Sequence, residues 1–511
     1  MASFRSFAVL CATVSYLASG VGAAVTSATC QTLEATTDIS IDHPIDIAYT
    51  QENSEYWSAG CTALKPACII KPTTAQEMSA VVKVLLQNNE TFSVKSGGHN
   101  PNQNFASIDG GPLISTANLN EVIYDAEAGT VRVGTGNRWE DVHKVLDGLN
   151  VTIVGGRIGN VGVGGYILGG GLSFLSGEHG WAANNLLEAD IVLANGTIVT
   201  ASNTQNSDLL KVLKAGGPNV GIVTAYTLKA HPVGQVWGGN LVFGSEKTAD
   251  LLKALRNFTL NYPDEKAGII LTSEITLSTL VNIWIMFLFY DGPTPPAGVF
   301  DMFTSLQPGV NSAKTRSYYD LLSFNDWAIV KGSVYTIATE TTTLPTAEFA
   351  DVADTHLTNC FNHWKNVSNS IAEVPGLIAS VAFQPYPAQF ARKAKAVDPS
   401  GDLLALDDSA DRIIFEFDYS YLPGLGAQND VKVDDATVRL YSGMKDIVDT
   451  AVADRRIPDA YRPLFMNDGY FRQDYWGRIA PESRELVQRV SAAVDPNQFF
   501  KTRTAGGFFV N

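Results

Sequence analysis

Short apolar blocks separated by turn residues dominate the first half of the chain. Most of these blocks are rich in β-branched side chains and bounded by glycine, proline or asparagine, which is typical of strands. Strands are predicted at 67–70, 92–95, 111–116, 130–134, 190–194, 197–200 and 221–229, and helices at 75–87, 139–149 and 207–214. The Asn195-Gly196 dipeptide between two of these strands predicts a tight hairpin turn.

The pattern changes near residues 233–240, and longer strand-like runs then alternate with amphipathic helices to about residue 460. Strands are predicted at 237–243, 269–275, 281–290, 377–383 and 412–421, and helices at 247–259, 347–368 and 434–455. This alternation predicts a second domain of the α+β class, a sheet with helices packed on one face. We expect residues 24–60 to form an irregular arm and the segment from Tyr461 to return to the first domain.

Length and charge narrow the classes of function. A chain of 511 residues with 45% hydrophobic residues is long enough for two domains. Its formal charge of -16 would repel phosphate groups, so we expect no nucleic-acid partner.

The N-terminus resembles a targeting signal. Residues 1–23 combine Arg5, a short apolar run and the small residues Val21-Gly22-Ala23, a pattern typical of a signal peptide. The most apolar later run, 280–290, has strand length and contains Asn282, so we expect no membrane span. The protein is therefore expected to be secreted, or delivered to a vesicle of the secretory pathway.

Secretion favours oxidised cysteines. Cys30, Cys61, Cys68 and Cys360 remain after the signal peptide, and four cysteines allow three pairings. We favour Cys30–Cys68, which would tie the arm to the first domain and leave Cys61 or Cys360 unpaired. No spacing of cysteines or histidines suggests a metal site. Sequons that could carry glycans occur at Asn89, Asn150, Asn195, Asn257 and Asn366.

The strongest candidate chemistry lies around His99. This residue follows Ser96-Gly97-Gly98 at the end of a predicted strand, where its imidazole could act as a nucleophile toward a cofactor. A glycine-rich stretch spans 155–171. Backbone N–H groups in such a stretch can surround a pyrophosphate. The spacing is not that of a Rossmann dinucleotide site.

These pieces, in this order, resemble the FAD-linked oxidases with a PCMH-type flavin domain, which include vanillyl-alcohol oxidase, berberine bridge enzyme and fungal oligosaccharide oxidases. The matching segments are Ser96-Gly97-Gly98-His99, the glycine runs 161–165 and 169–171, 221–224, Asn467-Asp468, 495–500 and 506–508. The resemblance implies an α+β protein with a two-lobed FAD-binding domain at 64–235, a substrate domain with an antiparallel sheet covered by helices at 236–460, and a C-terminal segment, 461–511, returning to the FAD domain.

The resemblance also implies the cofactor and its contacts. FAD would be bonded covalently to His99. Noncovalent contacts are assigned to Ser96, Gly97, Gly98, Gly162, Val163, Gly164, Gly165, Tyr166, Gly221, Ile222, Val223 and Asn467. Relatives with a second covalent bond have a cysteine where this chain has Ile158, so a single attachment is expected. Many relatives have a histidine where this chain has Tyr166, whose hydroxyl could hydrogen-bond the flavin or whose ring could simply pack beside it.

The catalytic base is less clearly marked. Relatives carry tyrosines at the positions of Phe465 and Asp468. We assign the base to Tyr470, and the alternatives are Tyr475, Asp468, Asp474, Tyr419 and Tyr421.

The resemblance predicts an oxidase of a small molecule, most consistent with an alcohol- or amine-bearing secondary metabolite. A hydride would pass to flavin N5 and on to O₂, giving H₂O₂, with oxidative ring closure as one outcome. Two alternatives stay open. One is an oligosaccharide or carbohydrate oxidase, against which Ile158 and Phe465 stand. The other is a flavin-bound cyclisation template without redox turnover.

Overall fold

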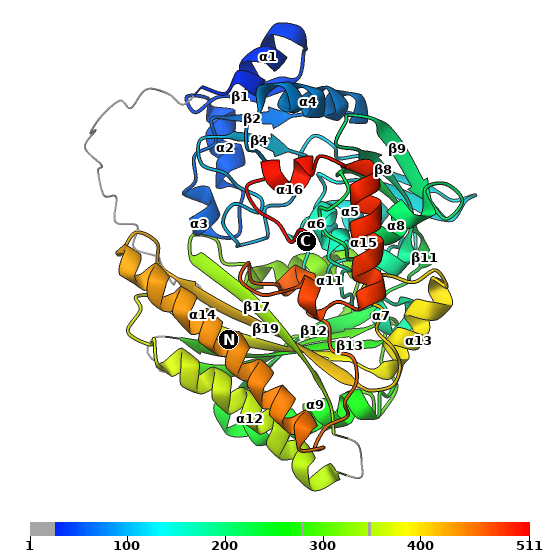
Figure 1. Ribbon diagram of the computed structural model, residues 1–511. Helices are drawn as coiled ribbons and strands as arrows, with labels where there is room; N and C mark the ends of the chain where they lie inside the picture. The colour runs from blue at the N-terminus through cyan, green and yellow to red at the C-terminus, as the bar shows by residue number, and fades with distance from the viewer. Residues whose placement is uncertain (1–25, 277–280, 346–348) are drawn as a thin grey trace, which may run out of the picture.

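The computed structural model describes residues 26–276, 281–345 and 349–511, so the predicted signal peptide at 1–23 lies outside the described residues. Three main sheets organise these ranges (Figure 1). Two lie in the first half of the chain, and the third and largest lies in the second half.

The first sheet joins the N-terminal arm to the strand before His99. Its order is β1 (Ser40–Asp42), β2 (Cys68–Lys71), β4 (Pro112–Ser115) and β3 (Ser93–Lys95). Strands β2, β4 and β3 are parallel, whereas β1 pairs antiparallel with β2. Helix α4 (Ala75–Asn88) is capped at its N-terminus by Thr74, whose hydroxyl accepts a hydrogen bond from the backbone N–H of Glu77.

The arm is more regular than the sequence predicted. It contains β1 and the helices α1 (Ala28–Thr36), α2 (Ile47–Ser54) and α3 (Ala59–Thr62). These elements are too short and polar to show an apolar period, so contacts with the rest of the protein hold them. The Glu90 carboxylate accepts hydrogen bonds from the backbone N–H groups of Ala28 and Thr29 at 2.8 and 2.9 Å.

A disulfide between Cys30 and Cys68 fastens α1 to β2, which confirms the favoured pairing. Cys61 and Cys360 are free and buried. The bridge spans 38 residues and closes the arm into a loop. It therefore limits the freedom of the unfolded chain over the whole arm.

Removing this bridge should destabilise the protein measurably. The double variant Cys30→Ser with Cys68→Ser should lose about 2–4 kcal/mol of unfolding free energy. Denaturant unfolding of both proteins, with and without reductant, measures the difference. Reductant should destabilise the wild type and leave the double variant unaffected; equal stability of the two oxidised proteins would contradict the expectation.

The second sheet is antiparallel throughout. Its order is β5 (Val122–Asp125), β6 (Thr130–Gly134), β10 (Ile222–Lys229), β8 (Leu186–Val192) and β9 (Ile198–Ser202). Strands β8 and β9 form the hairpin predicted around Asn195-Gly196, with Gly196 at a φ of +78°. The other elements between residues 139 and 232 are α5 (Trp139–Leu146), β7 (Val151–Thr152), α6 (Val163–Leu168), α7 (Ser176–His179), η1 (Ala182–Asn185), α8 (Ser207–Leu213) and β11 (His231–Pro232).

The third sheet begins with β12 and is also antiparallel. Its order is β15 (Val310–Asn311), β12 (Val236–Gly244), β14 (Val281–Tyr290), β13 (Ala267–Thr276), β18 (Ile378–Tyr386), β19 (Arg412–Tyr421) and β17 (Val334–Thr343), with β16 (Lys314–Arg316) paired to β12. Strand β17 was not predicted. Its second half is a polar run, Thr339 to Thr343, which packs buried because its side chains find hydrogen-bond partners.

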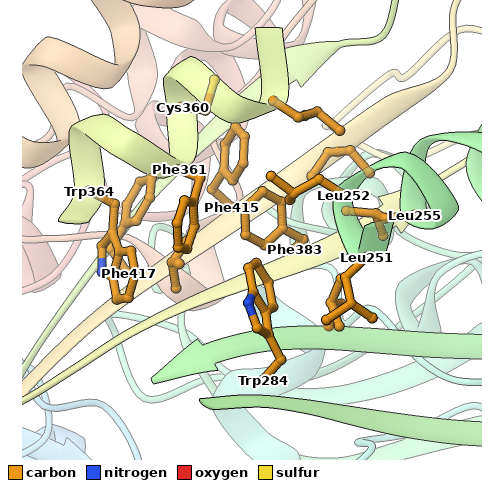
Figure 2. Close-up of a cluster of buried hydrophobic side chains, with 14 of the residues drawn as sticks. Leu251, Leu252, Leu255, Trp284, Cys360, Phe361, Trp364, Phe383, Phe415 and Phe417 are labelled. Atoms are coloured by element: carbon orange, nitrogen blue, oxygen red, sulfur yellow. The ribbon is translucent and has the colours of Figure 1, made fainter. Parts of the chain in front are cut away.

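Helices cover one face of this sheet. They are α9 (Thr248–Leu260), α12 (Ala350–Asn369) and α14 (Ala427–Ala453) (Figure 1). Figure 2 shows the core between these helices and the sheet, in which Trp364 of α12 lies with Trp284, Phe383 and Phe415 of the strands. The other helices are α10 (Asp301–Thr304), α11 (Tyr318–Asn325), α13 (Ala388–Val397), α15 (Pro481–Val494), α16 (Phe499–Arg503), η2 (Ser245–Lys247), η4 (Asp326–Ala328), η6 (Met466–Asp468) and η7 (Trp476–Arg478).

Strand β19 shows how the two faces of the sheet differ. Phe415 and Phe417 belong to the helix-covered core. Because successive strand residues point to opposite faces, Glu416, Asp418 and Ser420 project from the other face. This second face turns toward the first domain and forms part of the site described below.

The C-terminal segment packs against the first domain. The backbone N–H of Phe92 donates to Arg503 O at 2.9 Å, and the N–H of Ala505 donates back to Phe92 O at 2.9 Å. In Figure 1, α16 lies beside the N-terminal elements, although the two are far apart in sequence. Within the described ranges, no helix has both the length and the apolarity needed to cross a bilayer.

Candidate active site

A cavity of about 550 Å³ lies between the second face of the third sheet, which carries Glu416 and Asp418, and the glycine-rich loops of the first domain. The predicted cofactor residues that line it are Ser96, Gly97, Gly98, His99, Gly162, Gly164, Gly165, Tyr166, Gly221, Ile222, Val223 and Asn467. Val163 is the exception: its side chain is fully buried in the core of the first domain and is not part of the wall. The structure thus gathers residues that are up to several hundred positions apart.

His99 is held as a neutral imidazole in the cavity wall. Burial lowers the pKa of this imidazole to about 3, and the positive charges of Arg138 and Lys331 lower it further. Its Nε2 is buried and has no hydrogen-bond partner. The ring stacks on the indole of Trp57, with centroids 4.6 Å apart. At neutral pH, His99 therefore has the unprotonated form that a nucleophile requires.

The glycines of the wall serve two different purposes. A Cβ added to Gly97 would lie 2.4 Å from Gly162 Cα, so these two glycines allow two loops to touch. A Cβ on Gly164 would lie 2.8 Å from the Ser96 hydroxyl oxygen. Gly165 differs, because a Cβ there would meet no atom within 4 Å although the residue lines the cavity. Its bare backbone leaves room for a bound molecule.

A larger side chain at Gly165 should separate folding from cofactor binding. Gly165→Leu would project into the cavity, and we expect it to fold with a melting temperature near that of wild type and to retain little FAD. Gly165→Ala is the matched control, because alanine favours a helix over glycine by about 1 kcal/mol and adds only one carbon. Flavin absorbance per chain after gel filtration is the measurement. Normal flavin content in the leucine variant would show that the space is not used.

The polar side-chain atoms of Tyr166 and Asn467 form hydrogen bonds with other parts of the protein. The Tyr166 hydroxyl donates to Leu172 O at 2.7 Å, which favours the packing role over a hydrogen bond to a ligand. Asn467 donates to Tyr166 O at 3.1 Å and accepts from the backbone N–H of Gly171 at 3.2 Å. Asn467 thereby fixes the C-terminal segment against the glycine stretch and places its neighbour, Asp468, in the cavity wall.

Three carboxyl groups meet in the cavity. Glu416 and Asp418 come from β19, and Asp468 comes from η6. Gln384 donates to Asp468 Oδ2 at 2.8 Å, and Arg157 of the glycine stretch donates to the Gln384 side-chain oxygen. Asp418 Oδ1 is buried and has no hydrogen-bond partner.

Burial raises the proton affinity of all three carboxyl groups, and neighbouring carboxylates add to this for Asp418 and Asp468. Burial raises the pKa of Asp418 well above its usual range, and the charges of Glu416 and Asp468 raise it further. The pKa of Asp468 is also raised well above its usual range, first by burial and then by Glu416. Burial raises the pKa of Glu416, and Arg157 opposes this shift. Neighbouring buried carboxylates oppose one another's ionisation, so the cluster keeps protons to a higher pH than separate, exposed carboxyl groups would.

The rest of this face carries Glu274 and Ser380 in the row of Asp418, and is largely apolar in the other direction. Four neighbouring strands each contribute one residue to a row across this face, and all four line the cavity: Ile285, Thr272, Ala382 and Glu416. Phe287 and Ile270 form the next row in one direction. The carboxyl cluster therefore lies at one end of an apolar floor.

The structure places Tyr470, the predicted base, away from the cavity. The Tyr470 hydroxyl donates to the Asp434 carboxylate of α14, and Tyr470 is absent from the cavity wall. Burial and the charge of Asp434 raise the pKa of this phenol, so it is a poor proton acceptor. Asp468 is the candidate that the structure does bring into the wall, whereas Tyr475, Asp474, Tyr419 and Tyr421 lie outside it.

Sequence reasoning missed Glu416, Asp418 and Arg157. One signal was available in Ile414-Phe415-Glu416-Phe417-Asp418, where two acids alternate with apolar residues inside a strand. Such a pattern places both carboxyls on one face, opposite the core. Nothing in the sequence shows that Asp468 meets them, because that contact depends on the packing of the C-terminal segment.

Comparison with known proteins agrees with this site. The family described as "FAD binding domain" matches residues 66–202. An uncharacterized FAD-linked oxidoreductase of Arthroderma benhamiae is 41% identical over 473 residues, which cover 92% of each chain. The bifunctional solanapyrone synthase of Alternaria solani is 42% identical over 244 residues, 47% of each chain. The chain belongs to the family of FAD-linked oxidoreductases.

Solved structures bear out the fold. Berberine bridge enzyme from Eschscholzia californica superposes with a TM-score of 0.72 at 17% identity and covers 94% of this chain and 99% of its own. Xylooligosaccharide oxidase from Myceliophthora thermophila gives a TM-score of 0.72 at 18% identity and covers 93% and 98%. The predicted α+β fold with a PCMH-type flavin domain is therefore confirmed, and so is its class as an FAD-dependent oxidoreductase.

The residues present fit FAD. The cavity wall offers a neutral imidazole at His99 and open space over Gly165. The cavity runs from the glycine-lined loops to the carboxyl cluster. One elongated ligand can therefore lie along the loops with one end near the carboxyl groups.

Proposed function

We propose that this protein is an FAD-dependent oxidase of a small secondary metabolite, with its flavin bonded once, to His99. The observation that carries the proposal is a single cavity with His99 and the glycine loops on one side and three buried carboxyls on the other. Bound FAD supplies the hydride acceptor, and O₂ takes the electrons to give H₂O₂. Ile158, which lines the same cavity, offers no thiol for a second bond.

Asp418 is assigned as the base. Asp418 lines the cavity, and one of its oxygens is buried without a hydrogen-bond partner, whereas Asp468 is engaged by Gln384. A substrate hydroxyl or amine that gives its proton to Asp418 becomes a better hydride donor at the adjoining carbon. A carboxylate with a raised pKa accepts that proton more readily than an ordinary aspartate.

The floor of the cavity supports an apolar substrate. Ile270, Ile285 and Phe287 offer hydrophobic contact and no hydrogen bonds to sugar hydroxyls. The similarity to a solanapyrone synthase over 47% of the chain points in the same direction. The preferred substrate class is therefore a small, largely hydrophobic alcohol or amine, rather than an oligosaccharide.

Passage through the secretory pathway is part of the proposal. It is supported by the Cys30–Cys68 disulfide and by the exposure of Asn89, Asn150, Asn195 and Asn366, with Asn257 half-buried. These asparagines are the proposed glycan sites.

Anaerobic mixing of the flavoprotein with panels of hydrophobic alcohols, hydrophobic amines and oligosaccharides tests the function. We expect loss of the oxidised flavin absorbance with members of the first two panels, and stoichiometric peroxide when air is admitted. Reduction by oligosaccharides alone would favour the carbohydrate-oxidase alternative. Product formation with no reduction and no O₂ uptake would instead favour a cyclisation template.

A further inference from the structure

Trp57 links the proposed flavin attachment residue to the substrate domain. Its indole contacts two other rings. The imidazole of His99 stacks on it, with centroids 4.6 Å apart and planes inclined by 19°. The phenol ring of Tyr335, from β17, is 4.2 Å away at 30°. All three residues line the cavity.

Backbone contacts hold this stack in place. The Trp57 N–H donates to Gly98 O at 3.0 Å, directly beside His99. The next two residues form hydrogen bonds with β17 and with the residue before it. Ser58 Oγ accepts from the Tyr335 N–H at 3.0 Å, and the Ala59 N–H donates to Ser333 O at 2.8 Å. Residues 57–59 are therefore joined both to the His99 loop and to the third sheet.

The stack restricts the orientation of the imidazole. Nε2 of His99 is buried without a partner, so no hydrogen bond at that atom fixes the plane of the ring. Stacking against a large, 7% exposed indole restricts rotation of the ring about its side-chain bonds. Bond formation at carbon needs the attacking nitrogen aligned within a narrow range of angles.

We propose that Trp57 is a positioning residue for flavin attachment, an inference that rests on the proposed bond between His99 and FAD. The bond joins an imidazole nitrogen to the 8α methyl carbon of the flavin. One N–H and one C–H bond are lost and one N–C bond forms. Two protons leave, and the two electrons reduce the flavin, from which O₂ removes them as H₂O₂. Trp57 takes no part in these transfers and acts by holding the His99 ring.

The test compares two substitutions of similar size. Trp57→Phe keeps an aromatic face against His99, whereas Trp57→Leu keeps apolar volume without one. The full-length chain, produced under riboflavin limitation, is mixed with FAD in air. The fluorescence of flavin that stays with the acid-denatured chain is followed over time, and total bound flavin is measured before denaturation. Trp237→Leu is the control, because Trp237 lies outside the cavity wall and stacks on Phe300 instead.

We expect Trp57→Leu to bind FAD in the normal ratio and to attach it about tenfold more slowly or worse, because a misaligned nucleophile loses much of its advantage of proximity. Trp57→Phe should recover most of the rate, and Trp237→Leu should attach FAD at the wild-type rate. Attachment at the wild-type rate in Trp57→Leu would overturn the inference, as would equal slowing in the leucine and phenylalanine variants.

Two further outcomes are informative. If Trp57→Leu fails to fold, Tyr335→Leu decides the matter, because it removes the outer ring of the stack: slower attachment supports the inference and an unchanged rate refutes it. Wild-type protein without acid-stable flavin would refute the covalent bond itself, whereas acid-stable flavin in both wild type and Trp57→Leu at equal rates refutes only the role of Trp57.

Discussion

His99→Ala is expected to yield a protein whose flavin is released completely by acid. The imidazole is the proposed attachment point, and no thiol is available at Ile158 to replace it. Loss of the bond also removes the electronic effect of alkylation, which makes the flavin a stronger oxidant. We expect turnover to fall by at least about tenfold, equivalent to about 1.4 kcal/mol of activation free energy. Acid precipitation with fluorescence of the pellet, and the rate of anaerobic flavin reduction, measure the two effects.

The matched control is His43→Ala. His43 carries the same side chain, is 40% exposed and pairs with Glu34 on the arm, away from the cavity. It should retain acid-stable flavin and wild-type turnover. Flavin that stays with the acid-denatured His99→Ala chain would place the attachment at another residue.

Asp418→Asn should reduce the rate of flavin reduction by about 10²–10⁴-fold, the usual contribution of a positioned general base. Asparagine has nearly the same shape but cannot accept a proton at neutral pH. FAD binding and thermal stability should be unaffected or improved, because the change removes a charge from a crowded group of buried carboxyls. Stopped-flow reduction under anaerobic conditions isolates the step in question. A rate within a few-fold of wild type would exclude Asp418 as the base.

The pH dependence offers a second readout on the same cluster. A base must be unprotonated, so the reduction rate should fall as the pH drops through the pKa of Asp418, which lies well above the usual aspartate range. Glu416→Gln removes a neighbouring negative charge and should lower that pKa. The acidic limb of the profile should then move to lower pH while its plateau is retained. A profile that stays in place would mean that Glu416 does not act on the base.

Much of the fold was predictable from the sequence. Strand β14 falls on the predicted range, β19 likewise, and α4 and α9 are within a residue or so of theirs. These elements carry a clear apolar period, so burial of one face dictates both their type and their limits. Strand β17 and the arm escaped prediction. Their buried or ordered residues are polar and are held by hydrogen bonds to distant segments, as with Thr341 Oγ1 donating to Pro463 O at 2.7 Å.

The candidate site likewise has one part that the sequence predicted and another that only the packing of the elements decided. The His99 loop and the glycine stretch are continuous motifs, and they identified the cofactor without any knowledge of the packing. The sequence favoured Tyr470 as the base, but Tyr470 contacts Asp434 outside the cavity, whereas Asp468, two residues earlier, lies in the cavity wall. Only the register of β19 beside β18, together with the anchoring of Asn467 by the glycine stretch, brings Glu416, Asp418 and Asp468 together.

The sequence by itself predicted a flavin-binding first domain, a helix-covered sheet and a histidine suited to hold FAD. Each of these features corresponds to a pattern within a run of neighbouring residues. The tertiary structure alone decided which carboxyl groups face the flavin site and which ring lies against His99. Those relations join residues tens to hundreds of positions apart, and their proximity arises from the packing of whole elements rather than from any local pattern.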